Sequence, residues 1–136
     1  MIILAVDLGQ ARTGLAVCDK TEFLASPLPQ ISERNMDVLS DKIAEIAKEK
    51  KVELIVLGLP KNMDGSEGES AQNARAFGKT LEEKTGLEVR MQDERGTTIT
   101  AHNYLNTTNT RGKKRKNVVD SVAATIILQN FLDSRR

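Results

Sequence analysis

The chain has 136 residues, of which 39% are hydrophobic and 29% charged, and its formal net charge is +1. This is an ordinary globular composition, and the length allows one domain with a real core but not two. No apolar run approaches the ~20 residues of a membrane span, no export signal precedes the first predicted strand, and the single cysteine excludes an internal disulfide. These features predict a cytoplasmic protein with one domain over residues 1–136 and no membrane association.

The first predicted element is a buried strand, Ile2–Val6, which is followed at once by Asp7 and then Gly9. A carboxylate at the end of a core strand is costly to desolvate unless it is paired, hydrogen-bonded or bound to a cation. A second strand is predicted at 15–18, and the short connection with Gly9 and Gly14 suits an antiparallel hairpin whose backbone approaches a bulky or charged group such as a phosphate. Asp7 is therefore either a functional residue or a turn residue that caps its own loop.

The rest of the chain alternates between strand and helix patterns. Two prolines restrict the segment 22–31 to a short edge strand. The pattern then predicts a helix from Asn35 or Asp37 to about Lys50 with Val38 on its apolar face, a strand at 54–57, a helix at 70–84 and a strand at 87–92. Helices are also predicted from 97 or 98 to 105 and from 118 to about 133, with a mobile polar segment at 106–116 between them. This order predicts an α/β protein with a mixed central sheet of about five strands flanked by helices.

Three carboxylates occupy positions where the predicted elements favour apolar residues. Asp7 and Glu94 end predicted strands that are expected to lie side by side, and Asp120 lies beside the apolar face of the last helix. Ordinary alternatives are an ion pair of Glu94 with a neighbouring arginine and a helix-dipole role for Asp120 in the first turn. Together the three acids predict an oxygen-only site that suits Mg²⁺ or Mn²⁺. Two such ions in a carboxylate cluster are the usual machinery for cleaving phosphodiesters.

A basic run lies just before the last predicted helix, where five of the six residues in RGKKRK at 111–116 are basic. The run predicts either a phosphate clamp or a solvated loop. Because only 3% of the residues are aromatic, we expect any nucleic acid to be bound through its backbone and shape rather than by base stacking. The candidate substrate-binding residues are Arg12, Lys61, Arg75, Arg95, Lys113, Lys114, Arg115 and Lys116.

Four ordered motifs, which cover nearly the whole chain, resemble those of the YqgF/RuvX family. They are Asp7-Leu-Gly9 with Arg12-Thr-Gly14, the loop from Gly58 to Gly65, Asp93-Glu94-Arg95 followed by two threonines, and the segment from Val119 to Ala124. The resemblance implies a ribonuclease-H-like fold, a cytoplasmic nuclease of bacterial type, and catalytic roles for Asp7, Glu94 and Asp120. Members are described either as Holliday-junction resolvases or as nucleases that mature the 5′ end of pre-16S ribosomal RNA. Gly96 departs from the family, whose members commonly have a larger apolar residue there.

The residues leave other classes of function open. Actin-like phosphotransferases also hold phosphates with an Asp-x-Gly hairpin, but they enclose nucleotide between two domains of this fold. A non-catalytic RNA-binding module would not explain acids at strand ends. The preferred prediction is therefore a metal-dependent endonuclease, a monomer or homodimer, with rRNA maturation favoured over junction resolution in branched DNA.

Overall fold

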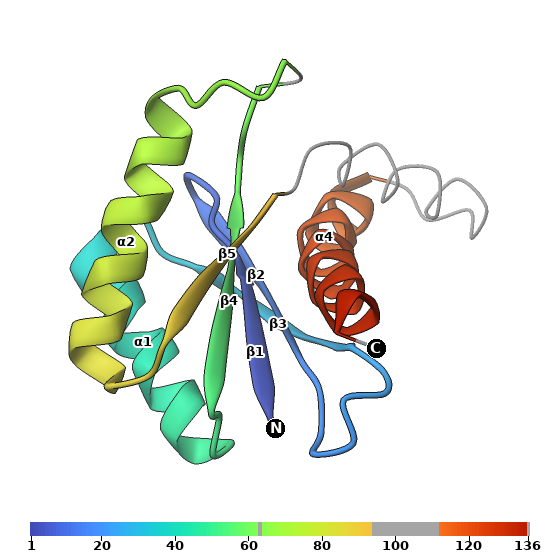
Figure 1. Ribbon diagram of the computed structural model, residues 1–136. Helices are drawn as coiled ribbons and strands as arrows, with labels where there is room; N and C mark the ends of the chain where they lie inside the picture. The colour runs from blue at the N-terminus through green and yellow to red at the C-terminus, as the bar shows by residue number, and fades with distance from the viewer. Residues whose placement is uncertain (63, 94–111, 136) are drawn as a thin grey trace.

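A computed structural model describes residues 1–62, 64–93 and 112–135, with the backbone alone for 112–121. The described strands form one five-stranded sheet in the order β3-β2-β1-β4-β5 (Figure 1). Strands β1, β4 and β5 run parallel, whereas β2 is antiparallel to both β1 and β3, so the predicted mixed sheet is confirmed. The strands are β1 (Ile3–Asp7), β2 (Arg12–Val17), β3 (Ser26–Ser32), β4 (Leu54–Leu59) and β5 (Val89–Asp93).

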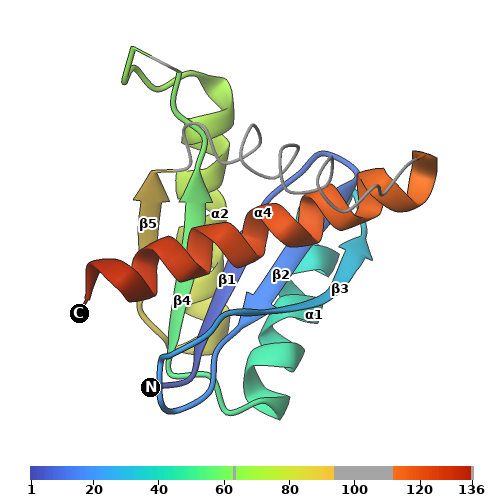
Figure 2. The ribbon, with the colours of Figure 1, turned by 90° about the vertical axis from the view of Figure 1, so that its right-hand side faces the viewer.

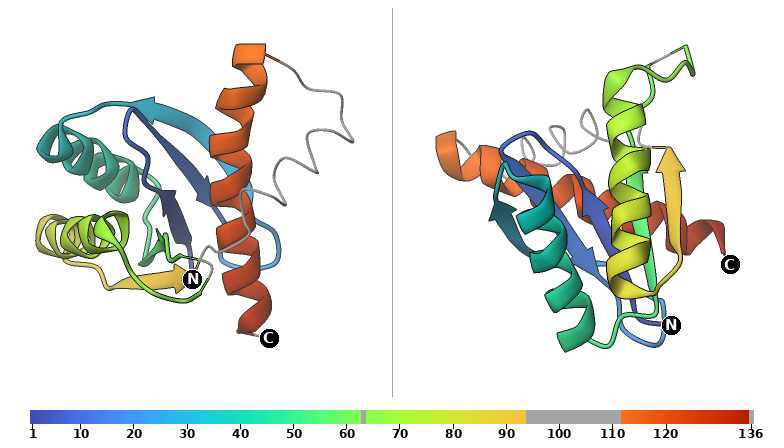
Figure 3. Two further views of the ribbon diagram at one scale, coloured as in Figure 1. Left: turned by 90° about the horizontal axis from the view of Figure 1, so that it is seen from above. Right: turned by 90° about the vertical axis from the view of Figure 1, so that its left-hand side faces the viewer.

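Helices cover both faces of this sheet, as seen from above in Figure 3. Helices α1 (Met36–Glu49) and α2 (Glu69–Thr85) pack on one face, and α4 (Gly112–Ser134) crosses the other (Figure 2). On β1, Leu4 and Val6 belong to the core beneath α1 and α2, while Ile3 and Ala5 belong to the core beneath α4. The strand is thus buried on both sides, which explains its continuous apolar sequence. Over the described residues, no helix combines the length and apolarity needed to cross a membrane.

Local sequence signals position several of these elements as predicted. Asn35 caps α1, since its side chain accepts hydrogen bonds from the backbone N–H groups of Asp37 and Val38. Gly86 ends α2 with a φ of 71°, the left-handed conformation that glycine adopts most readily. Strand β3 is an outermost strand of the sheet, the place where prolines are tolerated because one side of the strand has no partner. The expected burial of Val38 is wrong, because it is 40% exposed and the neighbouring position 39 points into the core instead.

Two further expectations are corrected by the sheet topology. Strand β2 begins at Arg12 rather than Leu15, because Gly14 pairs with Asp7 and extends the ladder toward the turn. Strand β5 pairs with β4 and not with β1, since both sides of β1 are already occupied by β2 and β4. The carboxyl ends of β1, β4 and β5 nevertheless share one edge of the sheet, at the top of Figures 1 and 2.

Candidate active site

Asp7 is the last residue of β1 and lies at this shared edge, half-buried. Side chains alternate between the two faces of a strand, so Asp7 lies on the same face as Ile3 and Ala5. That is the face covered by α4. Asp7 is the only charged residue of β1. It follows the fully buried Ile3 and Ala5 on the face between the sheet and α4.

Glycines stand beside Asp7 on both neighbouring strands. Gly14 is its antiparallel partner on β2, and Gly58 on β4 follows the last printed parallel pair, Val6 with Leu57. Both glycines are buried and, by alternation, lie on the α4 face. Neither neighbour therefore places a side chain beside the Asp7 carboxylate. Glycine within a strand is typical of places where a ligand or another backbone comes close, and this signal was present in the sequence.

The turn after Asp7 depends on Gly9. A Cβ atom at this position would lie 2.1 Å from the backbone oxygen of Arg12, a contact that only a backbone shift could relieve. We therefore expect Gly9→Ala to lower the free energy of unfolding by about 1–3 kcal/mol and to displace the adjacent Asp7. Chemical denaturation and a cleavage assay would measure the two effects. Unchanged stability together with unchanged activity would contradict this description of the turn.

Strand β5 ends at Asp93, the residue that precedes Glu94 in the sequence. Val89 and Met91 pack against the core on the α1 and α2 side, so alternation puts Asp93 on that face, opposite to Asp7. The next position, Glu94, lies outside the described residues, as do Arg95 and the helix predicted at 97–105. Within the side chains that the structure describes, no three His, Cys, Asp or Glu residues gather to hold a metal ion. The predicted trio is not covered by that finding, because two of its side chains are not described.

Helix α4 begins earlier than the sequence pattern predicts. It starts at Gly112 rather than Val118, so the basic residues at 113–116 are helical and do not form the expected polar loop. Asp120 accordingly lies in the third turn and not in the first, where a helix dipole would favour an acid. Its position is four and seven residues before Ala124 and Ile127, which are buried against the sheet. This spacing follows the sheet-facing stripe of the helix.

The remaining basic candidates have different surroundings. Arg12 begins β2 at the site edge, and Lys61 follows β4 at the same edge. Arg75 donates two hydrogen bonds, of 2.7 and 2.8 Å, to the carboxylate of Glu67. This pairing raises the pKa of Arg75 and lowers the pKa of Glu67, and it ties the loop at 60–68 to α2. Among the described residues, the partner of Arg75 is therefore Glu67 of the loop at 60–68, and the pair stabilises this loop against α2.

The loop itself carries internal order that the sequence did not reveal. The Asn62 amide donates to the Ser66 hydroxyl at 2.9 Å, and the Ser66 backbone and hydroxyl both donate to Asp64. The bond from the Ser66 backbone to the Asp64 side chain closes an Asx-type turn. The same polar residues are also common in irregular loops, so the sequence alone did not predict this turn. The loop projects beyond the end of β4, above the site edge in Figure 2.

Comparison with known proteins supports a common architecture. Residues 1–134 match the model of a family described as "RuvX: Holliday junction resolvase". A "Putative pre-16S rRNA nuclease" of Clostridium beijerinckii is 42% identical over 133 residues, covering 98% of this chain and 96% of that protein. A protein of the same name from Leuconostoc mesenteroides is 42% identical over 138 residues, covering 99% and 96% of the two chains.

Solved structures share the fold at low sequence identity. Thermus thermophilus RuvC in complex with a Holliday junction substrate has a TM-score of 0.61 at 11% identity and covers 99% of this chain and 96% of that one. Fowlpox virus resolvase, in complex with Holliday junction DNA, has a TM-score of 0.59 at 14% identity and covers 99% of both chains. The predicted ribonuclease-H-like fold is therefore confirmed.

Proposed function

Because the chain belongs to the RuvX family, we propose that it is a metal-dependent nuclease, one domain over residues 1–136, that hydrolyses phosphodiester bonds in the cytoplasm. The observation that carries this proposal is the half-buried Asp7, which ends a core strand on the α4 face between two glycines. A carboxylate at the end of a core strand, on the face that α4 covers, is well placed to bind a cation between the sheet and the helix.

Asp7, Glu94 and Asp120 are the proposed catalytic and metal-binding residues. Their carboxylate oxygens suit Mg²⁺ or Mn²⁺, and Asp7 fits the role because it faces the helix whose sheet-facing stripe includes position 120. Two such ions, when bound, would activate a water molecule and stabilise the leaving oxygen. The protein's part is to hold these acids together, with Asp7 at the end of β1 and position 120 on α4. Because positions 14 and 58 are glycines, neither neighbouring strand places a side chain beside Asp7.

The proposed principal substrate is pre-16S rRNA, cleaved during maturation of its 5′ end, because the relatives described above are named as nucleases of pre-16S rRNA. Junction resolution is the second candidate, because the matching family model and the similar solved structures are of resolvases. The chain matches relatives named as nucleases over nearly its full length. This match favours a nuclease over an actin-like phosphotransferase or a non-catalytic RNA-binding module.

The two substrates can be compared directly. Wild-type protein with Mg²⁺ would be incubated with a precursor rRNA fragment and with a synthetic four-way junction, and its mass in solution would be measured. A two-fold dimer suits a symmetric junction, whereas trimming of an RNA end requires no symmetry. We expect cleavage of the precursor. Cleavage of the junction alone by a stable dimer would favour the second candidate, and cleavage of neither would contradict the nuclease proposal.

The basic part of α4 provides a proposed contact for the substrate backbone. At 3.6 residues per turn, positions 113 and 116 lie within about 40° of Asp120 around the helix axis, whereas 114 and 115 lie on the far side. We expect Lys113→Ala with Lys116→Ala to weaken substrate binding and to reduce the slope of log affinity against log salt by about 0.7 per lost contact to single-stranded nucleic acid. The cleavage rate of saturated enzyme should change much less.

The matched control is Lys114→Ala with Arg115→Ala, which removes the same charge from the same helix. Binding would be measured by fluorescence anisotropy at several salt concentrations. We expect a smaller loss of affinity in this control pair. Equal losses of affinity in the two double variants would indicate a general charge effect. No loss in either would indicate that this part of α4 is a solvated surface, and Arg12 and Lys61 would then be the next candidates for substrate binding.

A further inference from the structure

A cavity of about 550 Å³ lies on the opposite face of the sheet from α4, between the turn after β1 and helices α1 and α2. Its volume is within the range of roughly 300–1,000 Å³ that is usual for small-ligand sites. Leu8 forms part of its wall, and by alternation Leu8 and the preceding Asp7 face opposite sides of the same strand end. The cavity therefore adjoins the proposed active site at the sheet edge.

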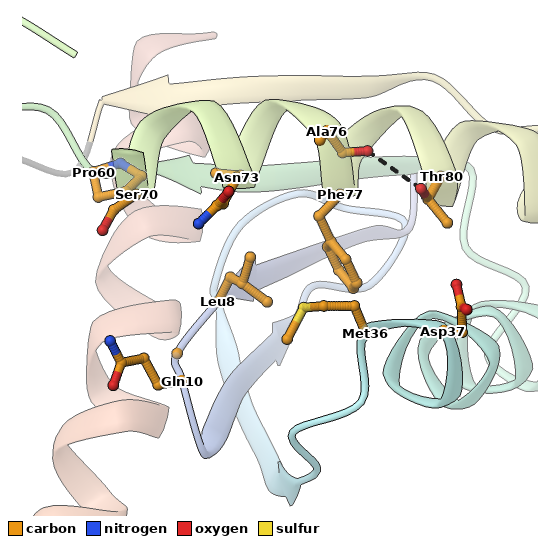
Figure 4. A pocket seen from close by; sticks show the side chains of 12 residues that line it. Leu8, Gln10, Met36, Asp37, Pro60, Ser70, Asn73, Ala76, Phe77 and Thr80 are labelled. Atoms are coloured by element: carbon orange, nitrogen blue, oxygen red, sulfur yellow. Dashed lines mark hydrogen bonds between the residues drawn. The ribbon is translucent and has the colours of Figure 1, made fainter. Parts of the chain in front are cut away.

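The cavity has an apolar part and a polar end. In Figure 4 the side chains of Leu8, Met36 and Phe77 face one another, whereas Gln10 and Asn73 lie toward one end. Both side chains are exposed, and within the described part of the chain no protein group is hydrogen-bonded to their amides. Each amide can both donate and accept, so together they can read the polar edge of a ligand.

The charges around the cavity argue against a phosphate as its occupant. Among the described lining residues there is no lysine or arginine, and the charged side chain is the acid Asp37. An anion would find no basic side chain here, while a neutral and partly apolar group with polar edges would fit. A nucleobase has this chemistry, with an apolar face and donors and acceptors at its rim.

We propose that this cavity binds an unpaired base of the substrate strand, close to the phosphate that is cleaved at Asp7. This inference rests on the proposed nuclease function and narrows its substrate. A nucleic acid strand that passes Asp7 at the sheet edge would meet the cavity on the other face, where Leu8 and Gln10 line it. A base within a duplex is not available to it, so the substrate has at least one unpaired nucleotide there. This favours a single-stranded rRNA end over the fully paired arms of a junction.

The inference can be tested by moving one abasic nucleotide along a single-stranded precursor fragment. Affinity would be measured by fluorescence anisotropy in Ca²⁺, and cleavage of the same fragments would be measured separately in Mg²⁺. We expect the abasic nucleotide to weaken binding about tenfold at one position only, a loss typical of one well-bound base.

The variant Gln10→Ala with Asn73→Ala should weaken binding of the intact fragment by a similar factor. It should show little further loss with the abasic nucleotide at the sensitive position, because both changes remove the same interaction. Gln72→Ala, which removes an exposed amide from the next position on α2, is the matched control and should bind like wild type.

Three results would overturn the base site. The first is equal affinity for every abasic fragment, and the second is failure of the wild type to bind any fragment. The third is that the losses of affinity from the two substitutions and from the abasic nucleotide add up when they are combined. These outcomes are independent of cleavage. A protein that binds as expected but cleaves nothing in Mg²⁺ would contradict the nuclease function and leave the base site supported. Cleavage of every fragment, with no effect of the position of the abasic nucleotide, would support the nuclease function and contradict the base site.

Discussion

Asp7→Asn is expected to reduce the cleavage rate by about a thousandfold or more, equivalent to about 4 kcal/mol of transition-state stabilisation. Asn has nearly the same size and keeps one carbonyl oxygen, but it lacks the charge that a divalent cation requires. The free energy of unfolding should be unchanged or slightly higher, because a neutral side chain relieves repulsion among three proposed carboxylates in the metal-free protein. Single-turnover kinetics and chemical denaturation would measure the two quantities.

Asp93→Asn is the matched control for this substitution. It makes the same change of charge at the same sheet edge, but Asp93 lies on the opposite face, with Val89 and Met91. We expect it to retain most of the activity. If Asp7→Asn instead unfolded the protein while its soluble fraction still cleaved the substrate, Asp7 would be a structural residue and the proposed site would be wrong.

Removal of divalent cations is expected to have an effect as large as that of Asp7→Asn. Chelation with EDTA should abolish cleavage, and added Mg²⁺ or Mn²⁺ should restore it. Without cations, the proposed cluster of carboxylates would repel one another, so the site would not be ordered for catalysis. Ca²⁺ should bind to the oxygen ligands without supporting turnover, since it accepts a looser geometry.

A control for chelation is the affinity of the substrate in EDTA. If the basic residues of α4 bind the nucleic acid backbone, part of the binding should persist when cleavage is lost. Full cleavage in EDTA would contradict the metal mechanism, whatever the effect of the carboxylate variants.

The sequence predicted the elements whose signals are local. The apolar run of β1, the Asn35 cap of α1 and the stop at Gly86 each depend on neighbouring residues, and each is found as expected. The position of Asp7 at the end of a core strand was also predictable, because a single acid after a continuous apolar run is visible in the sequence itself.

Features that depend on pairing between distant segments were harder to predict. The start of β2 at Arg12 follows from the ladder between Asp7 and Gly14, which no local pattern specifies. The place of β5 beside β4 follows from the occupied sides of β1. Helix α4 begins at Gly112 because lysine and arginine are good helix formers, although a dense basic run also resembles a loop.

The cavity beside the proposed active site was not predicted, for a related reason. Its wall combines residues from one turn and two helices that are far apart in the sequence, such as Gln10, Met36 and Asn73. The small number of aromatic residues speaks against a platform on which bases stack, but not against a base held in a cavity. A cavity with apolar walls and free amides offers a different mode of recognition, which only the fold makes visible.

The location of the metal site is the central claim, and paramagnetic broadening of backbone amide signals by Mn²⁺ tests it most directly. In the wild type, titrated Mn²⁺ should first broaden the signals of Leu8, Gly14 and Gly58, which surround Asp7. Signals at the opposite edge of the sheet, such as those of Glu22 and Lys51, should remain sharp. The broadening should be lost in Asp7→Asn and retained in Asp93→Asn. Broadening that is centred elsewhere, or that persists unchanged in Asp7→Asn, would contradict a metal-dependent active site at the end of β1.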